Sequence, residues 1–427
     1  MVKISEEKCM KINEINKCRI CGNTDLISIL NLGEQVLSGR FPTEIDARIP
    51  KAPLELVKCN DENNQNACGL LQLKHSVSPD EMYGKKYGYR SGINRTMKQH
   101  LKEIVNQIEK MIDFNDGDVV LDIGSNDATL LKCYNNQKIV RIGIDPTGKQ
   151  FEEHYTENIK LIPDYFSASN FYSLGIKKKI KAITSIAMFY DLEEPMKFVQ
   201  DIKKILDKDG VWIQEQSYMP TMLKNNSFDT ICHEHLEYYS LKQIEWMIEK
   251  NDMKIINVEL NDINGGSFRI YVCHKNSQHK YNIDNINNIF SIEKEMRLDT
   301  EIPFKNFRNN IINLRNKLFN LIREEKEKGK SIFLYGASTK GNVILQYCGL
   351  DNKLITGAAD RNPEKWGLLT PGTKIPIMSE EEARNERPDY FLVLPWHFRN
   401  EFLERESEYL ESGGKFIFPL PEIEIFG

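Results

Sequence analysis

The chain has 427 residues, of which 40 % are apolar and 28 % charged, and its 57 Lys and Arg against 62 Asp and Glu give a net charge of −5. This length predicts two or three domains, and the balanced charge disfavours a nucleic-acid partner, which needs a strongly basic surface. The apolar stretches are far shorter than the ~20 residues of a membrane span, and the start lacks the apolar segment of a secretory signal. We therefore expect a cytoplasmic protein that does not associate with a membrane.

Four of the nine cysteines cluster near the N-terminus and indicate a metal site. An odd cysteine count in a long chain argues against a disulfide framework. Cys18 and Cys21 form a tight knuckle followed by glycine, and Cys59 and Cys68 form a second, wider pair. Four thiolates complete the tetrahedral shell of a structural zinc ion and leave no position open for catalysis. The alternative is a set of reduced thiols without a metal.

Further along the chain, apolar runs alternate with helical patterns. A tyrosine- and glycine-rich loop is expected from Glu81 to Gly92, and apolar residues three and four apart predict a helix over about 95–111. Alternation of strands with helices predicts a parallel sheet with crossover helices. The expected strands are Val119–Ile123, Val140–Ile144, Leu161–Ile162, Ala182–Ile186, Val211–Ile213, Ile255–Val258 and Phe268–Val272.

The last third of the chain contains a second series of the same kind. The stretch Tyr281–Lys330 is rich in asparagine and charge and contains a long amphipathic helical pattern, which we interpret as a bridge between domains. Strands are then expected from Ser331 and over Leu354–Ala359, Tyr390–Leu394 and Lys415–Phe418. The sequence therefore predicts an α/β fold with two successive α/β units.

The first glycine turn, within Val119–Leu131, indicates a ligand site. Gly124 lets a ligand approach the backbone over the start of a helix, and Asp145 follows the next strand, where its carboxylate can accept both hydroxyls of a ribose. Asn126 stands where a dinucleotide motif has its second glycine, so no pyrophosphate cradle is evident. Asp122 lies where a cationic amino-acid end is usually held, which favours S-adenosylmethionine over NAD. The alternative is a glycine turn that serves only packing.

A second glycine turn, Tyr335–Asn342, also follows a strand and opens a helix, and Asp360 ends the next strand. Its hydroxyls and backbone amides could hold a phosphate, with Lys340 supplying positive charge. We include Lys340 and Asn342 among the candidate substrate-binding residues. A turn retained only for packing is again the alternative.

The segment Asn226–Tyr239 contains the densest group of acid–base residues, centred on His233, Glu234 and His235. An imidazole beside a carboxylate has the tunable pKa that proton abstraction requires. Two alternatives are metal ligation by the two histidines, whose spacing differs from His-Glu-x-x-His, and a surface loop without a chemical role.

Several motifs occur in a fixed order along nearly the whole chain. They are Cys-x-x-Cys-Gly, Glu-Met-Tyr-Gly…Tyr-Arg-Ser-Gly, Asp-Ile-Gly-Ser-Asn-Asp, Phe-Asp-Thr-Ile-x-His-Glu-His-Leu-x-Tyr-Tyr, Asn-Gly-Gly-Ser-Phe-Arg and Tyr-Gly-Ala-Ser-Thr-Lys-Gly-Asn. Together they resemble the zinc-containing, three-domain sugar C-methyltransferases of deoxysugar pathways, which use S-adenosyl-L-methionine and act on nucleotide-linked keto-sugars.

The resemblance implies a zinc-binding domain over 1–80, a class I, Rossmann-like methyltransferase domain over 81–280, and a C-terminal Rossmann-like α/β domain over 281–427 on the nucleotide side of the substrate. It also implies that His235 is the catalytic base, with His233 as its rival and Glu234 as its neighbour. Tyr83 is implied to be a wall or hydrogen-bond donor of the same cleft.

The chain departs from the family pattern at two positions where the sugar is expected to lie. Cys232 stands where family members often have tyrosine, and Tyr190 stands where they often have histidine. Both are therefore candidate substrate-binding residues.

The favoured function is methylation of a carbon next to the ketone of a nucleotide sugar. His235 would remove the proton, and the enolate carbon would attack the methyl group of the sulfonium. The alternatives are O-methylation, in which His235 would deprotonate a hydroxyl, and a non-catalytic, zinc-anchored binding or scaffold module. The sequence leaves the oligomeric state open.

Overall fold

The N-terminal part of the chain forms a small antiparallel sheet in the computed structural model, which describes residues 10–62, 64–82, 90–156 and 158–427. Its elements are β1 (Ile12–Glu14), β2 (Leu26–Val36), β3 (Lys51–Cys59), β4 (Leu71–Leu73), β5 (His75–Val77) and α1 (Pro79–Met82). The main sheet has the order β11-β4-β3-β2, and its strand β11 (Glu237–Tyr238) comes from the middle of the chain. The predicted domain boundaries at residues 80 and 280 stay a prediction.

The middle of the chain forms a seven-stranded sheet with the order β12-β13-β10-β9-β6-β7-β8. Its strands are β6 (Val119–Ile123), β7 (Val140–Ile144), β8 (Ile159–Ile162), β9 (Ile180–Ile186), β10 (Leu206–Ser217), β12 (Met253–Asn261) and β13 (Ser267–His274). The helices are α2 (Arg95–Met111), α3 (Ala168–Tyr172), α4 (Pro195–Ile205), α5 (Met219–Lys224) and α6 (Leu241–Lys250). The adjacent strands β10, β9, β6, β7 and β8 are all parallel, as the alternating pattern predicts.

Strand β13 is antiparallel to both of its neighbours, which departs from the parallel sheet expected from the sequence. The reason is the short connection after β12, because a parallel crossover needs about a dozen residues or more. Asn264, Gly265 and Gly266 of this connection all have left-handed φ values. A Cβ on Gly266 would lie 2.3 Å from Cγ2 of Thr221, so this tight turn requires glycine there.

Helix α2 has the bounds that its apolar spacing predicts. Asn94 caps its start by accepting hydrogen bonds from the backbone N–H groups of Thr96 and Met97, which satisfies two otherwise unpaired donors. Its buried face includes Ile104 and Val105 and packs in one apolar cluster with β6 and β10.

The C-terminal part contains a six-stranded sheet with the order β16-β15-β14-β17-β18-β19, parallel except for β19. Its strands are β14 (Ile332–Tyr335), β15 (Gly357–Asp360), β16 (Ile377–Ser379), β17 (Tyr390–Val393), β18 (Lys415–Phe418) and β19 (Glu424–Phe426). The helices that precede or cover it are α7 (Ile283–Glu295), α8 (Ile302–Glu327), α9 (Thr339–Cys348), α10 (Glu380–Asn385), α11 (Arg399–Arg405) and α12 (Ser407–Glu411). Across the described ranges, no helix has both the length and the apolar character needed to cross a membrane.

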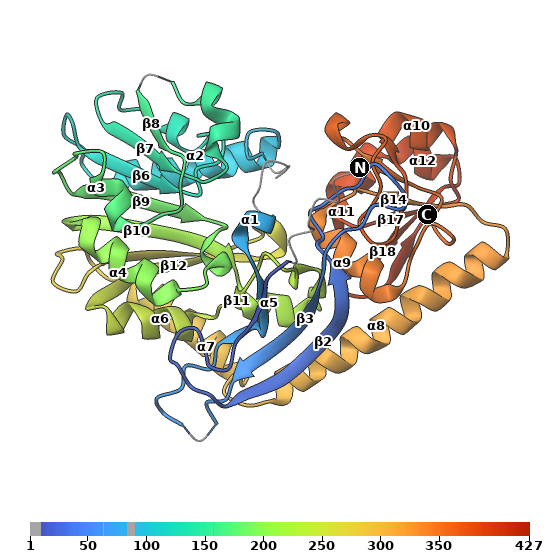
Figure 1. Cartoon of the computed structure of the whole chain (residues 1–427), viewed down its shortest axis with the longest axis horizontal. Coiled ribbons are helices and arrows are strands. Elements are labelled where there is room, and N and C mark those ends of the chain that lie inside the picture. Colours follow the sequence, from blue (N-terminus) through green and yellow to red (C-terminus); the bar gives the residue numbers. More distant parts are fainter. Residues whose placement is uncertain (1–9, 63, 83–89, 157) are drawn as a thin grey trace, which may run out of the picture.

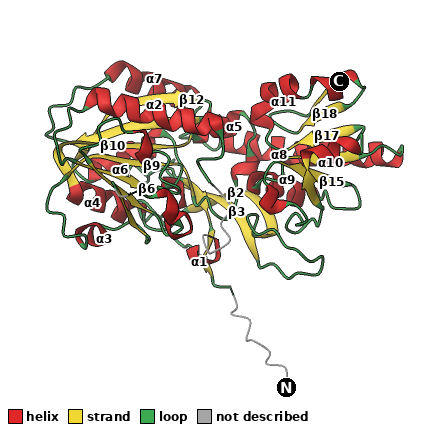
Figure 2. Cartoon of the chain, turned by 90° about the horizontal axis from the view of Figure 1, so that it is seen from above, coloured by secondary structure: helices red, strands yellow, loops and turns green. Residues whose placement is uncertain are grey.

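The N-terminal sheet packs against both of the other parts. Figure 1 shows the middle and C-terminal sheets as two lobes, with β2 and β3 running between them and α8 along the C-terminal lobe, and Figure 2 shows the same central position of β2 and β3. One apolar cluster contains Leu56 of β3, Met219 of α5, Phe304 of α8 and Leu334 of β14. The N-terminal sheet therefore connects the two lobes.

Candidate active site and zinc cluster

Four cysteine thiols converge beside the end of β3. The Sγ atoms of Cys18, Cys21, Cys59 and Cys68 all lie within 4.8 Å of one another, and the pairs Cys18–Cys68 and Cys21–Cys59 are 3.5 Å apart. Tetrahedral zinc with Zn–S bonds of about 2.3 Å places its sulfur ligands about 3.8 Å apart. The cluster therefore fits a zinc ion held by four thiolates, with no open position for catalysis.

The cysteine knuckle positions a buried arginine next to the His-Glu-His segment. Arg19, which directly follows Cys18, donates from Nη1 to the carbonyl of Leu73 at 2.6 Å, and its Nε lies 3.6 Å from Oε1 of Glu237. Glu237 belongs to β11, so the metal cluster and the candidate catalytic segment are connected through one side chain.

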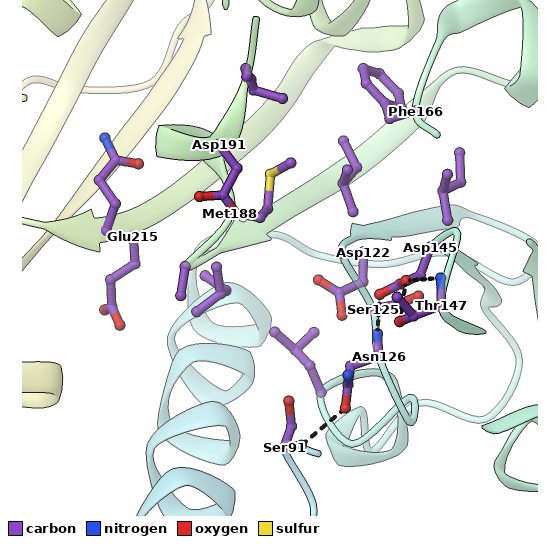
Figure 3. Close-up of a pocket in the computed structure, with 18 of the residues that line it drawn as sticks. Ser91, Asp122, Ser125, Asn126, Asp145, Thr147, Phe166, Met188, Asp191 and Glu215 are labelled. Atoms are coloured by element: carbon purple, nitrogen blue, oxygen red, sulfur yellow. Dashed lines mark hydrogen bonds between the residues drawn. The ribbon is translucent and has the colours of Figure 1, made fainter. Parts of the chain in front are cut away.

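A cavity of about 440 Å³ lies at the carboxyl ends of the parallel strands of the middle sheet. All four residues predicted to bind the cofactor line it: Asp122, Gly124, Asn126 and Asp145. The strand order reverses at β6, and such a switch point is where open α/β sheets bind ligands. Figure 3 shows Asp122 and Asp145 next to each other on this wall of the cavity.

Asp145 is held in one orientation by its own turn. Its Oδ2 accepts a hydrogen bond from the backbone N–H of Asn126 at 2.8 Å, and its Oδ1 accepts from the N–H and the hydroxyl of Thr147, both at 2.6 Å. The side-chain oxygen of Asn126 in turn accepts from the N–H of Ser91 at 3.0 Å (Figure 3). A fixed carboxylate after β7 suits a ligand with hydroxyl donors.

Asp122 is buried and accepts a hydrogen bond from the hydroxyl of Thr184 at 2.6 Å. Burial raises the pKa of Asp122 to about 7, and the Asp145 carboxylate contributes to the same effect. A cationic ligand would favour the charged form of this carboxyl group. This wall of the cavity therefore fits a positively charged group.

Gly124 has a left-handed φ of 72°, which favours glycine. A Cβ at this position would lie 3.1 Å from Cγ of Met188, which also lines the cavity. A side chain on residue 124 would therefore displace Met188 and change the shape of the cavity.

Backbone pairing holds the His-Glu-His segment between two parts of the molecule. The N–H of Leu236 donates to the carbonyl of Tyr190 at 2.7 Å, and the carbonyl of Leu236 accepts from the N–H of Leu73 at 2.8 Å. The preceding residue, His235, is therefore fixed between the short helical turn after β9, Phe189–Asp191, and the N-terminal sheet.

His235 is a neutral imidazole with a defined tautomer. Its Nδ1 lies 2.8 Å from the carbonyl oxygen of Thr230, and because a carbonyl can only accept, the proton is on Nδ1 and the lone pair on Nε2. Burial and the nearby Lys340 cation lower the pKa of His235 to about 3. Its ring packs on Tyr190, with 4.4 Å between the ring centroids, and both residues line a second, smaller cavity.

The other residues of the segment have different surroundings. His233 is buried and donates from Nε2 to the carbonyl of Ala52 at 3.0 Å, and burial lowers its pKa to about 4. Burial also raises the pKa of Glu234, whose Oε1 lies beside Gly39, and that of the Cys232 thiol. The hydrogen-bond acceptor that orients His235 is thus a backbone carbonyl and not the carboxyl group of its neighbour.

Lys340 and Asn342, which both lie on α9, have different partners. Lys340 donates from Nζ to the carbonyl of Asn264 at 3.3 Å, and Asn264 lines the large cavity. Asn342 is fully buried and donates from Nδ2 to the carbonyl of Ser38 at 2.8 Å. Tyr83 lies outside the described residues.

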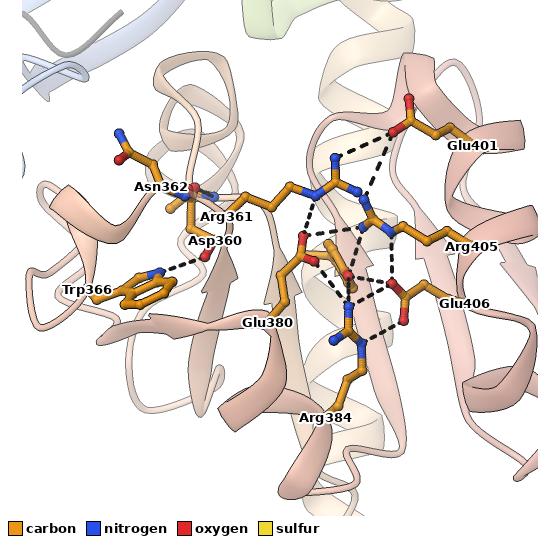
Figure 4. Close-up of polar contacts among 11 residues, drawn as sticks. Asp360, Arg361, Asn362, Trp366, Glu380, Arg384, Glu401, Arg405 and Glu406 are labelled. Atoms are coloured by element: carbon orange, nitrogen blue, oxygen red, sulfur yellow. Dashed lines mark hydrogen bonds and ion pairs between the residues drawn. The ribbon is translucent and has the colours of Figure 1, made fainter. Parts of the chain in front are cut away.

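Asp360 is hydrogen-bonded to the second glycine turn, Tyr335–Asn342. Its Oδ2 accepts from the N–H of Ala337 at 2.9 Å and lies 3.3 Å from Nζ of Lys365, while its Oδ1 accepts from the N–H of Asn362 at 2.8 Å. Figure 4 shows a network of ion pairs beside this turn. Its members are Arg361, Glu380, Arg384, Glu401, Arg405 and Glu406. These contacts give this side of the turn a structural role.

Glu215, which no sequence motif singles out, lines the large cavity on the side opposite Asp145 (Figure 3). Its carboxylate accepts from Nε2 of His100, from Nε of Arg269 at 2.8 Å and from Nδ2 of Asn261 at 3.0 Å. Burial acts to raise the pKa of Glu215, but the His100 hydrogen bond and the Arg269 charge lower it overall. The sequence signal was a lone carboxylate at the end of an apolar strand.

Comparison with protein families matches three consecutive regions of the chain. Residues 18–83 match a zinc binding domain, residues 93–258 a methyltransferase domain, and residues 262–421 a C-methyltransferase C-terminal domain. The C-methyltransferase NovU of Streptomyces niveus is 28 % identical over 417 residues, which cover 96 % of this chain and 97 % of NovU.

Solved structures include similar methyltransferases. A S-adenosylmethionine-dependent methyltransferase from Clostridium acetobutylicum has a TM-score of 0.32 and 14 % identity, with 43 % of this chain and 93 % of that chain covered. Magnesium protoporphyrin IX methyltransferase from Synechocystis with bound S-adenosylmethionine has a TM-score of 0.31 and 10 % identity, with 42 % and 79 % covered.

The strand-end cavity and the matched domains define an S-adenosylmethionine-dependent methyltransferase with an added zinc-binding domain. Within that class, the three matched regions and the similarity to NovU over nearly the full length show that the chain belongs to the three-domain C-methyltransferase family. Its cofactors are S-adenosyl-L-methionine and zinc, and its acceptor is a small molecule. The cavity with two strand-end carboxyl groups and the four clustered thiols fit these cofactors.

Proposed function

We propose that this enzyme methylates a carbon next to the ketone of a nucleotide-activated sugar, with His235 as the base. The observation that carries the proposal is the neutral imidazole of His235, whose lone pair is on Nε2. S-adenosylmethionine, when bound, supplies an electrophilic methyl group on a sulfonium. The remaining task of the protein is to generate the carbon nucleophile and hold it in position.

His235 suits proton abstraction because Thr230 fixes its ring and its proton. A carbon next to a ketone is a weak acid, so its deprotonation needs a base that is unprotonated near pH 7. Burial and, after it, the positive charge of Lys340 lower the pKa of His235, so the strength of that base depends in part on Lys340. An anionic diphosphate bound at Lys340 would offset this charge and make His235 a stronger base. This coupling favours a nucleotide-linked substrate.

We also propose roles for the other candidate substrate-binding residues. We assign Lys340, next to the turn that contains Asn264, to the diphosphate. Tyr190, which packs on the His235 ring, and the neighbouring Cys232 are assigned to the sugar. The side-chain oxygen of Asn342 is buried and has no hydrogen-bond partner in the described ranges, but Asn342 lines neither cavity, so its assignment to the substrate stays a prediction.

We assign Asp145 to the ribose of the cofactor, so Asp145→Ala should weaken the binding of S-adenosylhomocysteine. Loss of hydrogen bonds to a charged carboxylate costs about 1.5–3 kcal/mol, which corresponds to roughly tenfold to a hundredfold in Kd. Calorimetric titration measures this change. Asp116→Ala, which removes an exposed aspartate in the turn before β6, is the matched control. Equal Kd values for the two variants would contradict the assignment.

We assign Asp122 to the cationic amino-acid end of the cofactor, and this assignment predicts a pH dependence. The pKa of Asp122 is about 7 in the free protein, whereas a bound ammonium group would keep the carboxylate ionised. Binding therefore releases a proton, and the affinity for S-adenosylhomocysteine should fall about tenfold between pH 8 and pH 6. Asp122→Asn should remove this dependence. A wild-type affinity that is constant over this range would contradict the assignment.

A screen of nucleotide sugars tests the proposed substrate class. Purified enzyme is incubated with methyl-labelled S-adenosylmethionine and a panel of nucleoside-diphosphate-linked keto-sugars, with the same sugars reduced at the ketone as hydroxy-sugar controls. We expect mass spectrometry to detect label in a keto-sugar and none in its reduced counterpart. Labelling of the hydroxy sugars alone would contradict carbon methylation next to a ketone.

A further inference from the structure

The large cavity contains a buried amide that has no partner. Gln216 lies at the end of β10, is 1 % exposed and lines the cavity. Neither its Oε1 nor its Nε2 has a hydrogen-bond partner in the part of the chain that the structure describes. A buried side chain with both a donor and an acceptor unpaired is unfavourable, so it indicates a ligand that pairs with it.

Strand order places Gln216 far from the ribose end of the cofactor site. Strands β9 and β6 separate β10 from β7, which ends next to Asp145. At about 4.8 Å per strand, this distance is roughly 14 Å. Figure 3 shows Glu215, the neighbour of Gln216, across the cavity from Asp145. The next residue, Ser217, lines the smaller cavity together with His235, so the strand end that carries Gln216 is adjacent to the cavity of the proposed base.

Glu215 and Gln214, on the same strand, differ from Gln216 in their partners and in their place relative to the cavities. The carboxylate of Glu215 is occupied by His100, Arg269 and Asn261, so it has little capacity left for a ligand. Gln214, two residues earlier and therefore on the same face of the strand, is also buried without a partner for either amide atom. It is absent from the residues that line either cavity.

We propose that Gln216 binds the acceptor substrate next to its reacting carbon. Its Nε2 donates to the ketone oxygen, and this hydrogen bond strengthens as negative charge develops there during proton removal. Its Oε1 accepts from a hydroxyl on the adjacent carbon. The substrate class is therefore an α-hydroxy ketone, with oxygens on neighbouring carbons. This inference rests on the proposed function, which supplies the ketone and the base.

The test compares Gln216→Met with Gln214→Met, because methionine has a similar length and no amide. Calorimetry measures the Kd of S-adenosylhomocysteine, and steady-state kinetics measure kcat and KM for the keto-sugar found in the screen. We expect Gln216→Met to lower kcat/KM by about tenfold or more with the Kd unchanged. Gln214→Met should match the wild type in both measurements and thereby report any purely structural effect of losing a buried amide.

Each outcome has a defined meaning. Unchanged kcat/KM in folded Gln216→Met, or an equal loss in both variants, would overturn the role of Gln216 while leaving the proposed function intact. A weaker Kd for S-adenosylhomocysteine in Gln216→Met would make it a cofactor residue and would also overturn the inference. If the wild type methylates no keto-sugar, the proposed function fails first, and this inference fails with it.

Discussion

His235→Asn should abolish methyl transfer and leave the binding of S-adenosylhomocysteine unchanged. The amide of asparagine can still donate a hydrogen bond toward the carbonyl of Thr230, but the basic nitrogen is lost. A general base of this kind contributes roughly 10²–10⁴-fold to the rate, and we expect a loss of turnover in that range. Single-turnover assays with labelled cofactor measure it, and calorimetry checks that the cofactor site is intact.

His233→Asn is the matched control, because His233 is a buried imidazole two residues away that contacts Ala52. We expect it to reduce turnover less than His235→Asn does. The reverse ranking would assign the base to His233. If neither variant loses more than about tenfold, well below the upper end of the general-base range, the histidine mechanism is wrong.

Removal of zinc should cause the second large effect. The four thiols hold the knuckle that contains Arg19, and Arg19 contacts Leu73 and Glu237 on either side of the β4–β11 pairing. Structural zinc sites contribute about 10–16 kcal/mol in small zinc domains. Chelation should therefore loosen the N-terminal sheet and release the His235 segment, and activity should fall and return when zinc is added.

Cys59→Ser and Cys133→Ser distinguish this effect from a general loss of thiols. Cys133 is a half-buried cysteine outside the cluster, so its variant should keep the metal and the activity. Cys59→Ser should lower both. Binding of S-adenosylhomocysteine should change little, because its cavity lies in the middle sheet. Elemental analysis that finds well under one zinc per chain in the wild type would contradict the four-cysteine site.

Elements with strong local patterns could be predicted from the sequence. The apolar spacing of 95–111 and the continuous apolar runs at 119–123 and 140–144 correspond to α2, β6 and β7. Each of these patterns depends only on residues close together in the sequence, so it predicts its element without knowledge of distant contacts. Parallel strands end at the same edge of a sheet, so Asp122 on β6 and Asp145 after β7 both reach the cavity next to the glycine turn.

Features that depend on distant contacts could not be predicted. The pairing of β11 with β4 joins residues about 165 positions apart, and nothing in the local pattern of Glu237–Tyr238 indicates that partner. The same holds for Arg19, whose contacts with Leu73 and Glu237 depend on the assembled core. The antiparallel direction of β13 could have been predicted, because the connection before it is too short for a crossover.

The residue types of the site could be predicted from the sequence, but their arrangement in space could not. The clustering of His233, Glu234 and His235 indicates acid–base chemistry, yet their different surroundings appear only in the fold. The sequence places the Glu234 carboxyl group next to His235, whereas the group that orients the His235 ring is the carbonyl of Thr230. Backbone carbonyls have no signature in the sequence, since every residue carries one.

Exchange of solvent deuterium into the keto-sugar tests the central claim most directly. Wild-type enzyme and His235→Asn are incubated in D₂O with the keto-sugar found in the screen, without S-adenosylmethionine, and NMR follows the proton on the carbon next to the ketone. We predict enzyme-dependent exchange at that carbon in the wild type and its loss in His235→Asn. Exchange at the same rate in both proteins, or none in a wild type that methylates the sugar in D₂O once the cofactor is added, would contradict proton removal from carbon by His235.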